Sequence, residues 1–128
     1  MKFLIVDDDP GNLFVLHGML KKYGLCDLVS NARLALGAFQ NSLSEKMPYD
    51  LILLDIMMPE MDGHACLAVL REIERECGVP PGKEVKVAMV SALRDTKNVC
   101  KAFFQGQAVC YIPKPVMLET IDELISSL

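Results

Sequence analysis

The sequence predicts an α/β domain of three layers, in which a five-stranded parallel sheet is flanked by five helices. Three observations carry this prediction. The 128 residues suit a single domain, short apolar runs alternate with helix-length amphipathic segments, and the runs are nearly continuous in Val, Ile and Leu. Strands joined by helices pair in parallel through right-handed crossovers, and helices cover both faces of such a sheet. We therefore expect one domain over residues 1–128.

Five apolar runs are the predicted strands. Each is short, and its apolar residues are consecutive rather than alternating, a pattern typical of strands that are buried on both faces. The runs are residues 3–6, 25–29, 51–54, 85–90 and 108–112.

The first two predicted helices lie between the first three strands. Asp9 is a plausible N-cap and Pro10 suits the first helical position, so a helix is expected from Pro10 to about Tyr23, with Gly24 ending it. The second helix is expected over residues 32–42.

The third predicted helix has apolar residues at the spacing of one helical face, and a loop rich in Gly and Pro follows it over residues 77–83. The apolar positions are Cys66, Val69, Leu70, Ile73 and Cys77. Asp95 is expected to cap a fourth helix that reaches Gly106, and Pro115 is expected to start a fifth that runs to the end of the chain.

The composition excludes several classes of protein. Apolar residues make up 52% and charged residues 23%, which argues against a disordered chain. The net charge is −4 and no run of Lys or Arg exceeds Lys21-Lys22, which argues against a nucleic-acid surface or a polybasic membrane patch. No apolar run has the length of a signal-peptide core or a membrane span. We therefore expect a cytoplasmic protein that binds neither nucleic acid nor membrane.

The five cysteines do not form a recognisable framework. Their number is odd and no pair has CxxC spacing, so neither a set of disulfides nor a zinc ribbon is indicated. We expect buried thiols in a reducing compartment.

Polar residues follow four of the predicted strands at their carboxyl ends, where α/β sheets bind ligands. They are Asp7, Asp8 and Asp9 after the first strand, Asp55 after the third, Ser91 after the fourth, and Lys114 after the fifth. Carboxylates this close repel one another by about 1 to 4 kcal/mol per pair at ~4 Å, which a bound cation would offset. A few carboxylates with water suit Mg²⁺, and a lysine opposite suits a phosphate oxygen.

Metal, phosphate and lysine together predict a site for phosphoryl transfer. Asp55 stands alone after a central strand, whereas Asp7 and Asp8 are adjacent and better suited to holding the ion. A carboxylate can act as a covalent nucleophile in this chemistry. Asp55 is therefore the predicted phosphoryl acceptor.

Four segments in this order and spacing resemble the receiver domain of two-component response regulators. They are VDDDP at residues 6–10, LLDIMMPEMDG at 53–63, SA at 91–92 and YIPKP at 111–115. The resemblance covers essentially the whole chain and is similar in extent to stand-alone, chemotaxis-type regulators. It implies a flavodoxin-like sheet of strand order 2-1-3-4-5. It also implies a switch that is not a turnover enzyme.

The resemblance implies roles for the residues around Asp55, which would take a phosphoryl group from a phosphohistidine on a sensor histidine kinase or a phosphotransfer protein. Asp8, Asp55 and the backbone carbonyl of Met57 would bind Mg²⁺, and Asp7 would help directly or through water. The Ser91 hydroxyl would contact the phosphoryl oxygens.

The resemblance also assigns residues on the fourth and fifth strands. Lys114 and the backbone N–H of Ala92 would contact the phosphoryl group, and Ser91 and Tyr111 would act as the switch. Their movement would repack the face formed by the fourth helix, fifth strand and fifth helix. That face would meet a downstream protein target or a second copy of the chain.

Two positions imply a long-lived phosphorylated state. Met57 and Leu93 lie two residues past Asp55 and Ser91, where the resemblance places the path of the hydrolytic water, and neither side chain can orient water. We therefore expect slow loss of the phosphoryl group.

The sequence leaves two other functions open. One is a protein-interaction module that keeps the fold and works without phosphorylation. The other is an aspartyl-phosphate phosphatase, but that class has the pattern DxDxT, and here Pro10 and Gly11 follow Asp9.

Overall fold

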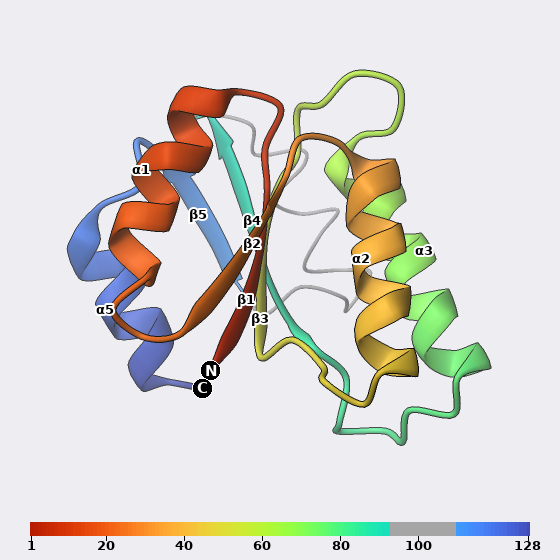
Figure 1. Ribbon diagram of the computed structural model, residues 1–128. Helices are drawn as coiled ribbons and strands as arrows, with labels where there is room; N and C mark the ends of the chain where they lie inside the picture. Colours follow the sequence, from red (N-terminus) through yellow and green to blue (C-terminus); the bar gives the residue numbers. More distant parts are fainter. Residues whose placement is uncertain (93–109) are drawn as a thin grey trace.

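The computed structural model describes residues 1–92 and 110–128, and it contains one sheet of five parallel strands in the order β2-β1-β3-β4-β5 (Figure 1). The strands are β1 (Lys2–Val6), β2 (Leu25–Val29), β3 (Leu51–Asp55), β4 (Lys86–Ala92) and β5 (Cys110–Lys114). The parallel sheet and its strand order are confirmed. Four strands have bounds that differ from the predicted runs by one or two residues, and β2 matches.

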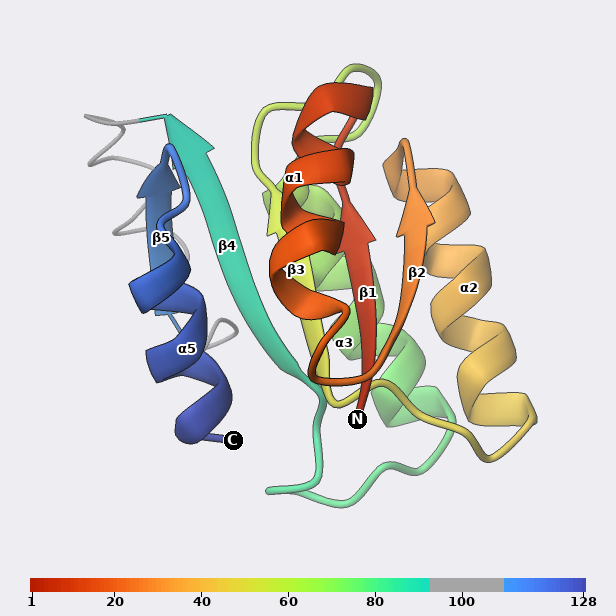
Figure 2. The ribbon, with the colours of Figure 1, turned by 60° about the vertical axis from the view of Figure 1, so that its left-hand side comes forward.

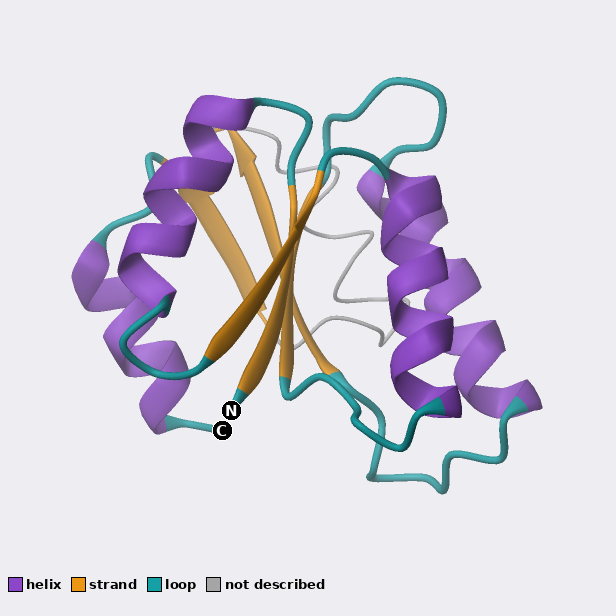
Figure 3. Cartoon of the chain, viewed as in Figure 1, coloured by secondary structure: helices purple, strands orange, loops and turns teal. Residues whose placement is uncertain are grey.

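Helices cover both faces of the sheet. They are α1 (Pro10–Leu20), α2 (Ala32–Ser44), α3 (Gly63–Glu76) and α5 (Leu118–Ser126). Figure 1 and the turned view in Figure 2 show α1 and α5 on one face and α2 and α3 on the other. Figure 3 shows the resulting order of helix layer, sheet and helix layer. The predicted helix from Asp95 to Gly106 lies outside the described residues.

Aspartate and asparagine side chains start three of the helices. The carboxylate of Asp9 accepts a hydrogen bond from Gly11 N at 2.8 Å, and Asp62 accepts one from Ala65 N at 2.8 Å. Asn31 caps α2 in the same way. Such caps satisfy backbone N–H groups that have no partner within the helix.

The end of α1 and the start of α5 lie three residues from their predicted positions, and α2 ends at Ser44 rather than at residue 42. Helix α1 ends at Leu20, because residues 21–23 form a turn in which Tyr23 N donates to Leu20 O at 2.9 Å. Helix α5 begins at Leu118 rather than Pro115, because Met117 has the extended backbone conformation of an N-cap residue.

The sheet separates two apolar clusters. The cluster on the α2 and α3 side includes Leu4, Phe39 and Leu54, and the cluster on the α1 and α5 side includes Ile5 and Ile121. Successive residues of a strand point to opposite faces, so β1 contributes to both clusters. Burial on both faces explains the consecutive apolar residues of β1 and β3.

Strand β2 is an exception to the predicted burial. It is an edge strand, and Leu25 and Leu28 are 70% and 40% exposed. The sequence indicated burial on both faces for all five runs, which is wrong for β2 and also for β5, the other edge strand, in which Ile112 alone is buried.

A buried ion pair holds the loop over residues 77–83 against α3. Glu74 is 2% exposed; its Oε1 lies 2.7 Å from Arg71 Nη1, and its Oε2 accepts a hydrogen bond from Val85 N at 2.7 Å. Arg71 also donates to Val85 O at 2.9 Å. These contacts tie the chain just after the loop to α3, at the amino end of β4 and so opposite the predicted site.

The described cysteines are free thiols in three environments. Cys66 is buried, Cys26 and Cys110 are half-buried, and Cys77 is exposed. Exposure of Cys77 contradicts the expectation of buried thiols, because this residue follows the last turn of α3 at the start of the loop. Cys100 lies outside the described residues. None of the helices described has both the length and the apolar content to cross a membrane.

Candidate functional site

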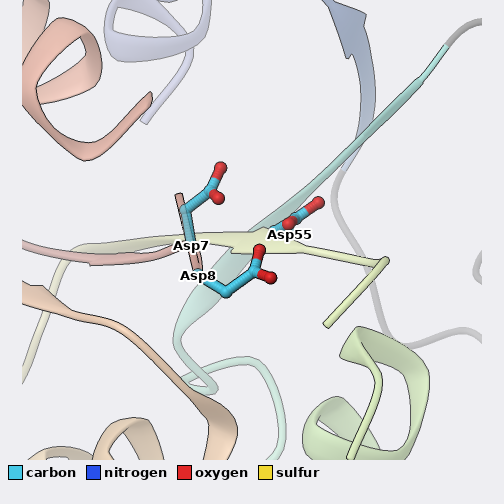
Figure 4. Close-up of side chains that lie close together, drawn as sticks. All are labelled: Asp7, Asp8 and Asp55. Atoms are coloured by element: carbon cyan, nitrogen blue, oxygen red, sulfur yellow. The ribbon is translucent and has the colours of Figure 1, made fainter. Parts of the chain in front are cut away.

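Three aspartates meet at the carboxyl ends of β1 and β3 (Figure 4). Each of Asp7, Asp8 and Asp55 offers one carboxylate oxygen, and these oxygens lie within 4.8 Å of one another. Asp7 is 1% exposed and Asp55 is 2% exposed, whereas Asp8 is exposed. The predicted cluster is therefore confirmed as a juxtaposition, with two carboxylates buried and one open to solvent.

Lys114, the last residue of β5, provides a positive charge beside the two buried carboxylates. Its Nζ lies 3.2 Å from Asp55 Oδ1 and 3.5 Å from Asp7 Oδ2. Neither of these oxygens accepts a hydrogen bond of good geometry from the described residues, so the ammonium is their nearest partner there. Three carboxylates against one ammonium leave the described cluster with excess negative charge.

Burial, together with this surplus of negative charge, alters the acidity of Asp55. Burial, followed by the nearby charge of Asp7, raises the pKa of Asp55 to about 6, although Lys114 and the backbone N–H of Met57 act in the opposite direction. Burial alone would lower the pKa of Lys114, but its ion pairs with Asp55 and Asp7 raise the pKa above its usual value. The carboxylate form of Asp55 is therefore destabilised, because burial and the charge of Asp7 outweigh the single ammonium of Lys114.

The donor set suits a hard divalent cation. Carboxylate oxygens with open coordination for water are the ligands that Mg²⁺ takes in phosphoryl-transfer sites. One buried oxygen each of Asp7 and Asp55 has no hydrogen bond from the described residues, and Asp8 faces solvent at the same cluster.

The strand register brings β4 alongside Asp55 and Lys114. Asp55 pairs with Val90 in the β3–β4 ladder, and Ala92 pairs with Lys114 in the β4–β5 ladder. Ser91 is fully buried between them, and its Oγ has no hydrogen-bond partner among the described residues. A buried hydroxyl without a partner is costly, which is consistent with a ligand group that Ser91 contacts when the site is in use.

Tyr111 links β5 to the end of β4. Its ring packs half-buried against the cluster on the α2 and α3 side, and its hydroxyl donates to Ala92 O at 3.2 Å. Tyr111 therefore contacts the backbone of a residue for which the sequence predicts a phosphoryl contact.

Met57 and Leu93 are the two positions predicted to set the lifetime of the phosphoryl group. Met57 is 64% exposed, in the loop that follows Asp55. Leu93 lies outside the described residues.

Gly63 positions Asp55, and the sequence analysis gave it no role. It is the first residue of α3, and its N–H donates to Ile56 O at 2.8 Å. A Cβ on Gly63 would lie 2.5 Å from Asp55 O and 2.8 Å from Ile56 Cα. Only glycine permits this close approach of α3 to the backbone that carries Asp55. The signal in the sequence was a glycine directly after the cap Asp62.

Comparison with known proteins agrees with this architecture. The response regulator receiver domain family matches residues 3–126. The chain is 32% identical over 124 residues to the hybrid signal transduction protein dokA of Dictyostelium discoideum, covering 96% of this chain and 7% of that protein. It is 33% identical over 122 residues to the two-component response regulator ARR11 of Arabidopsis thaliana, covering 94% of this chain and 21% of that protein. The chain thus spans a small part of these relatives.

Solved receiver domains have the same fold. The receiver domain of the histidine kinase CKI1 from Arabidopsis thaliana, complexed with Mg²⁺, has a TM-score of 0.83 at 25% identity, over 98% of this chain and 90% of that one. The receiver domain of Ssk1 from Saccharomyces cerevisiae, crystallised with the histidine phosphotransfer protein Ypd1, has a TM-score of 0.82 at 23% identity, over 98% and 86% of the two chains.

The family match covers nearly the whole chain, and its fold and acidic cluster agree with the geometry described above. This chain therefore belongs to the receiver domain family of two-component response regulators, the phospho-accepting switches of phosphorelay signalling.

Proposed function

We propose that Asp55 accepts a phosphoryl group from a phosphohistidine, with Mg²⁺ held by Asp7, Asp8, Asp55 and the backbone carbonyl of Met57. The observation that carries this proposal is the meeting of three carboxylates with the Lys114 ammonium at one edge of the sheet. Bound Mg²⁺ would neutralise charge on the phosphoryl oxygens. A receiver domain of CKI1 has been crystallised with Mg²⁺ and with BeF₃⁻, which supports the same use of this site here.

Asp55 acts as the nucleophile in this reaction. One of its carboxylate oxygens forms a bond to phosphorus while the bond between phosphorus and the histidine nitrogen breaks. The imidazole keeps that electron pair and takes up a proton. Lys114, whose Nζ lies 3.2 Å from Asp55 Oδ1, would hold a phosphoryl oxygen, and the Ser91 hydroxyl and the Ala92 N–H would hold others.

Phosphorylation changes the partner-binding face through Ser91 and Tyr111. The acyl phosphate adds about 1.5 to 2 negative charges where the described cluster already has an excess. Ser91 gains an acceptor for its unpartnered hydroxyl, and Tyr111 is coupled to this movement through its hydrogen bond to Ala92 O. The altered face would include β5 and α5, and it would meet a downstream protein or a second copy of the chain.

The donor is a sensor histidine kinase or a phosphotransfer protein. Relatives include the sensor histidine kinase GacS of Pseudomonas protegens, and the Ssk1 receiver was crystallised with Ypd1. That residues 1–128 form one stand-alone receiver domain in the cytoplasm stays a prediction.

The proposal is tested by incubating the protein with Mg²⁺ and acetyl phosphate and measuring its intact mass. We expect one phosphoryl group per chain in the wild-type protein and none in Asp55→Asn. Asp50→Asn is the matched control, because Asp50 lies at the opposite end of β3 and is exposed. Phosphorylation of Asp55→Asn would contradict the assignment. A wild-type protein that stays unmodified would favour a module that works without phosphorylation.

Met57 and Leu93 are proposed to make the phosphorylated state long-lived. Neither side chain can hydrogen-bond a water molecule beside the acyl phosphate. Phosphorylated Met57→Asn/Leu93→Glu protein is expected to lose its phosphoryl group faster than the wild type, and an unchanged decay rate would contradict this role. The protein is not a turnover enzyme, so no steady release of phosphate from a phosphomonoester is expected.

A further inference from the structure

Helix α1 has an outer face that is exposed and carries no charge. The helix lies on the outside of the sheet, next to α5 (Figure 2), and among the described helices it alone contains no Asp, Glu, Lys or Arg. Leu16 and Leu20 are buried in the core, whereas Phe14 is 79% exposed and Val15 is 52% exposed. A helix that meets water on one side normally has polar residues there, and an exposed apolar patch marks a surface that another molecule covers.

Two glycines make this face uneven. Gly11 and Gly18 are exposed, and with Phe14 and Val15 they have the i, i+3, i+4, i+7 spacing of a single helix face. A Cβ on Gly18 would meet no atom within 4 Å, so the space above its backbone is open. The ring of Phe14 therefore protrudes between two recesses where another backbone could approach closely.

The order of residues on this face is symmetric. From the midpoint between Phe14 and Val15, the exposed positions are apolar and then glycine in both directions along the helix. A two-fold axis through this midpoint would set α1 of one copy antiparallel to α1 of a second copy. Phe14 of each copy would then lie between Gly11 and Gly18 of the other. Such a contact is self-complementary, because the protruding and the recessed positions belong to the same face.

Charges at the ends of α1 favour the antiparallel arrangement. Asp8 precedes the helix and Lys21 caps its end, both are exposed, and both are equally far along the sequence from the midpoint. Antiparallel helices would place Asp8 of each copy beside Lys21 of the other, whereas parallel helices would bring like charges together. Opposed helix dipoles favour the same arrangement. The uncharged centre lets two chains of net charge −4 approach without close repulsion.

We propose that this face of α1 binds a second copy of the chain, in an antiparallel dimer with Phe14 at its centre. Aromatic side chains near the centre of an interface contribute much of the binding energy, and flanking charges set the orientation. Helix α1 has 11 residues and is about 16 Å long, so the contact is smaller than a standard interface of about 1,200 to 2,000 Å². The dimer is therefore weak, with a dissociation constant on the order of 100 µM. It uses neither β5 nor α5, and it needs no phosphoryl group on Asp55.

Dimerisation and Mg²⁺ binding would oppose each other through Asp8. In the dimer its carboxylate lies beside an ammonium of the second copy, and in the proposed Mg²⁺ site it is a ligand of the ion. Because coupling between two ligands is reciprocal, each should weaken the other. This consequence, unlike the dimer itself, rests on the proposed Mg²⁺ site. Sedimentation equilibrium with Mg²⁺ in place of EDTA measures it, and an unchanged dissociation constant would overturn the coupling.

The dimer is tested by sedimentation equilibrium of the metal-free, unphosphorylated chain from about 10 µM to about 1 mM, where we expect a reversible monomer–dimer equilibrium. Gly18→Leu should weaken the dimer at least about tenfold, because the leucine fills a recess beside Phe14 of the other copy. Gly37→Leu is the matched control, at an exposed glycine of α2 that also has no atom within 4 Å of an added Cβ, and it should change nothing. If apolar surface alone drove association, Gly18→Leu would strengthen the dimer, and that result would overturn the proposal.

Truncation and charge reversal test the remaining contacts. Phe14→Ala should weaken the dimer at least about tenfold, whereas Leu34→Ala, at a 47% exposed position of α2, should not. Lys21→Glu should weaken it because the new carboxylate faces Asp8, and Asp8→Lys/Lys21→Glu should restore it. A chain that stays monomeric at about 1 mM, or a dimer that Phe14→Ala leaves unchanged, would overturn the proposal. Failure of acetyl phosphate to modify Asp55 would leave these results unaffected.

Discussion

Gly63→Ala tests whether the contact between α3 and the backbone of Asp55 is as tight as the structure shows. The added Cβ would lie 2.5 Å from Asp55 O, about 0.9 Å inside ordinary van der Waals contact, and 2.8 Å from Ile56 Cα. Both neighbours are backbone atoms, so neither can rotate away. Overpacking of this kind costs about 1 to 3 kcal/mol. The better helix propensity of alanine offsets less than about 1 kcal/mol of this cost.

We therefore expect Gly63→Ala to lower the free energy of unfolding by about 2 kcal/mol, or the melting temperature by about 6 to 12 °C for a domain of this size. Urea unfolding followed by circular dichroism measures the first quantity and calorimetry the second. Because relief of the clash must move Asp55, phosphorylation by acetyl phosphate should also slow by on the order of tenfold or more.

Glycines within helices provide the control for Gly63→Ala. A Cβ on Gly18 or on Gly37 would meet no atom within 4 Å. Alanine at either position should stabilise the protein by about 0.5 to 1 kcal/mol, because glycine is a poor residue inside a helix. A Gly63→Ala protein that is as stable as these controls, and is phosphorylated at the wild-type rate, would refute the argument from close approach.

Burial and charge lead to further predictions at Arg71, Cys66 and Leu25. Arg71→Met should lower the free energy of unfolding by about 3 to 5 kcal/mol, because it leaves the Glu74 carboxylate buried without its cation; urea unfolding should show most of the loss recovered in Arg71→Met/Glu74→Leu. Burial raises the pKa of Cys66 to about 12, so iodoacetamide at pH 8 should modify exposed Cys77 and spare Cys66, as peptide mapping would show. The folded protein keeps a Cys66 proton that the unfolded chain releases above about pH 9, so this contribution to stability is present below pH 9 and should be lost as the pH rises toward 12. Leu25→Lys should change the free energy of unfolding by less than about 0.5 kcal/mol, since Leu25 is 70% exposed, and a larger loss in urea unfolding would contradict the edge position of β2.

The sequence predicted the sheet well where burial dictates composition. Strands β1 and β3 are covered on both faces, and their consecutive apolar residues reflect this directly. Strand β2 has an equally apolar sequence, but its position at the edge of the sheet leaves Leu25 exposed. The apolar composition of a strand shows that it could be buried, but the position of the strand in the sheet determines which of its side chains are covered.

The aspartates and Lys114 could be predicted to meet because parallel strands place their carboxyl ends at one edge. The distances between them depend on strand register, which the apolar pattern does not specify. The role of Gly63 depends on the angle at which α3 meets β3, and the exposure of Phe14 depends on which elements pack beside α1. Both are properties of packing between segments that are far apart in the sequence.

The crowding of Asp7, Asp8 and Asp55 has a consequence for how the protein behaves in solution. Mutual repulsion of these carboxylates is a free-energy penalty that the folded chain bears and the unfolded chain escapes. Any cation that settles among them in the folded state alone will shift the unfolding equilibrium by mass action. The melting temperature should therefore rise with the concentration of such a cation, so a melting curve would report how much of the site is occupied.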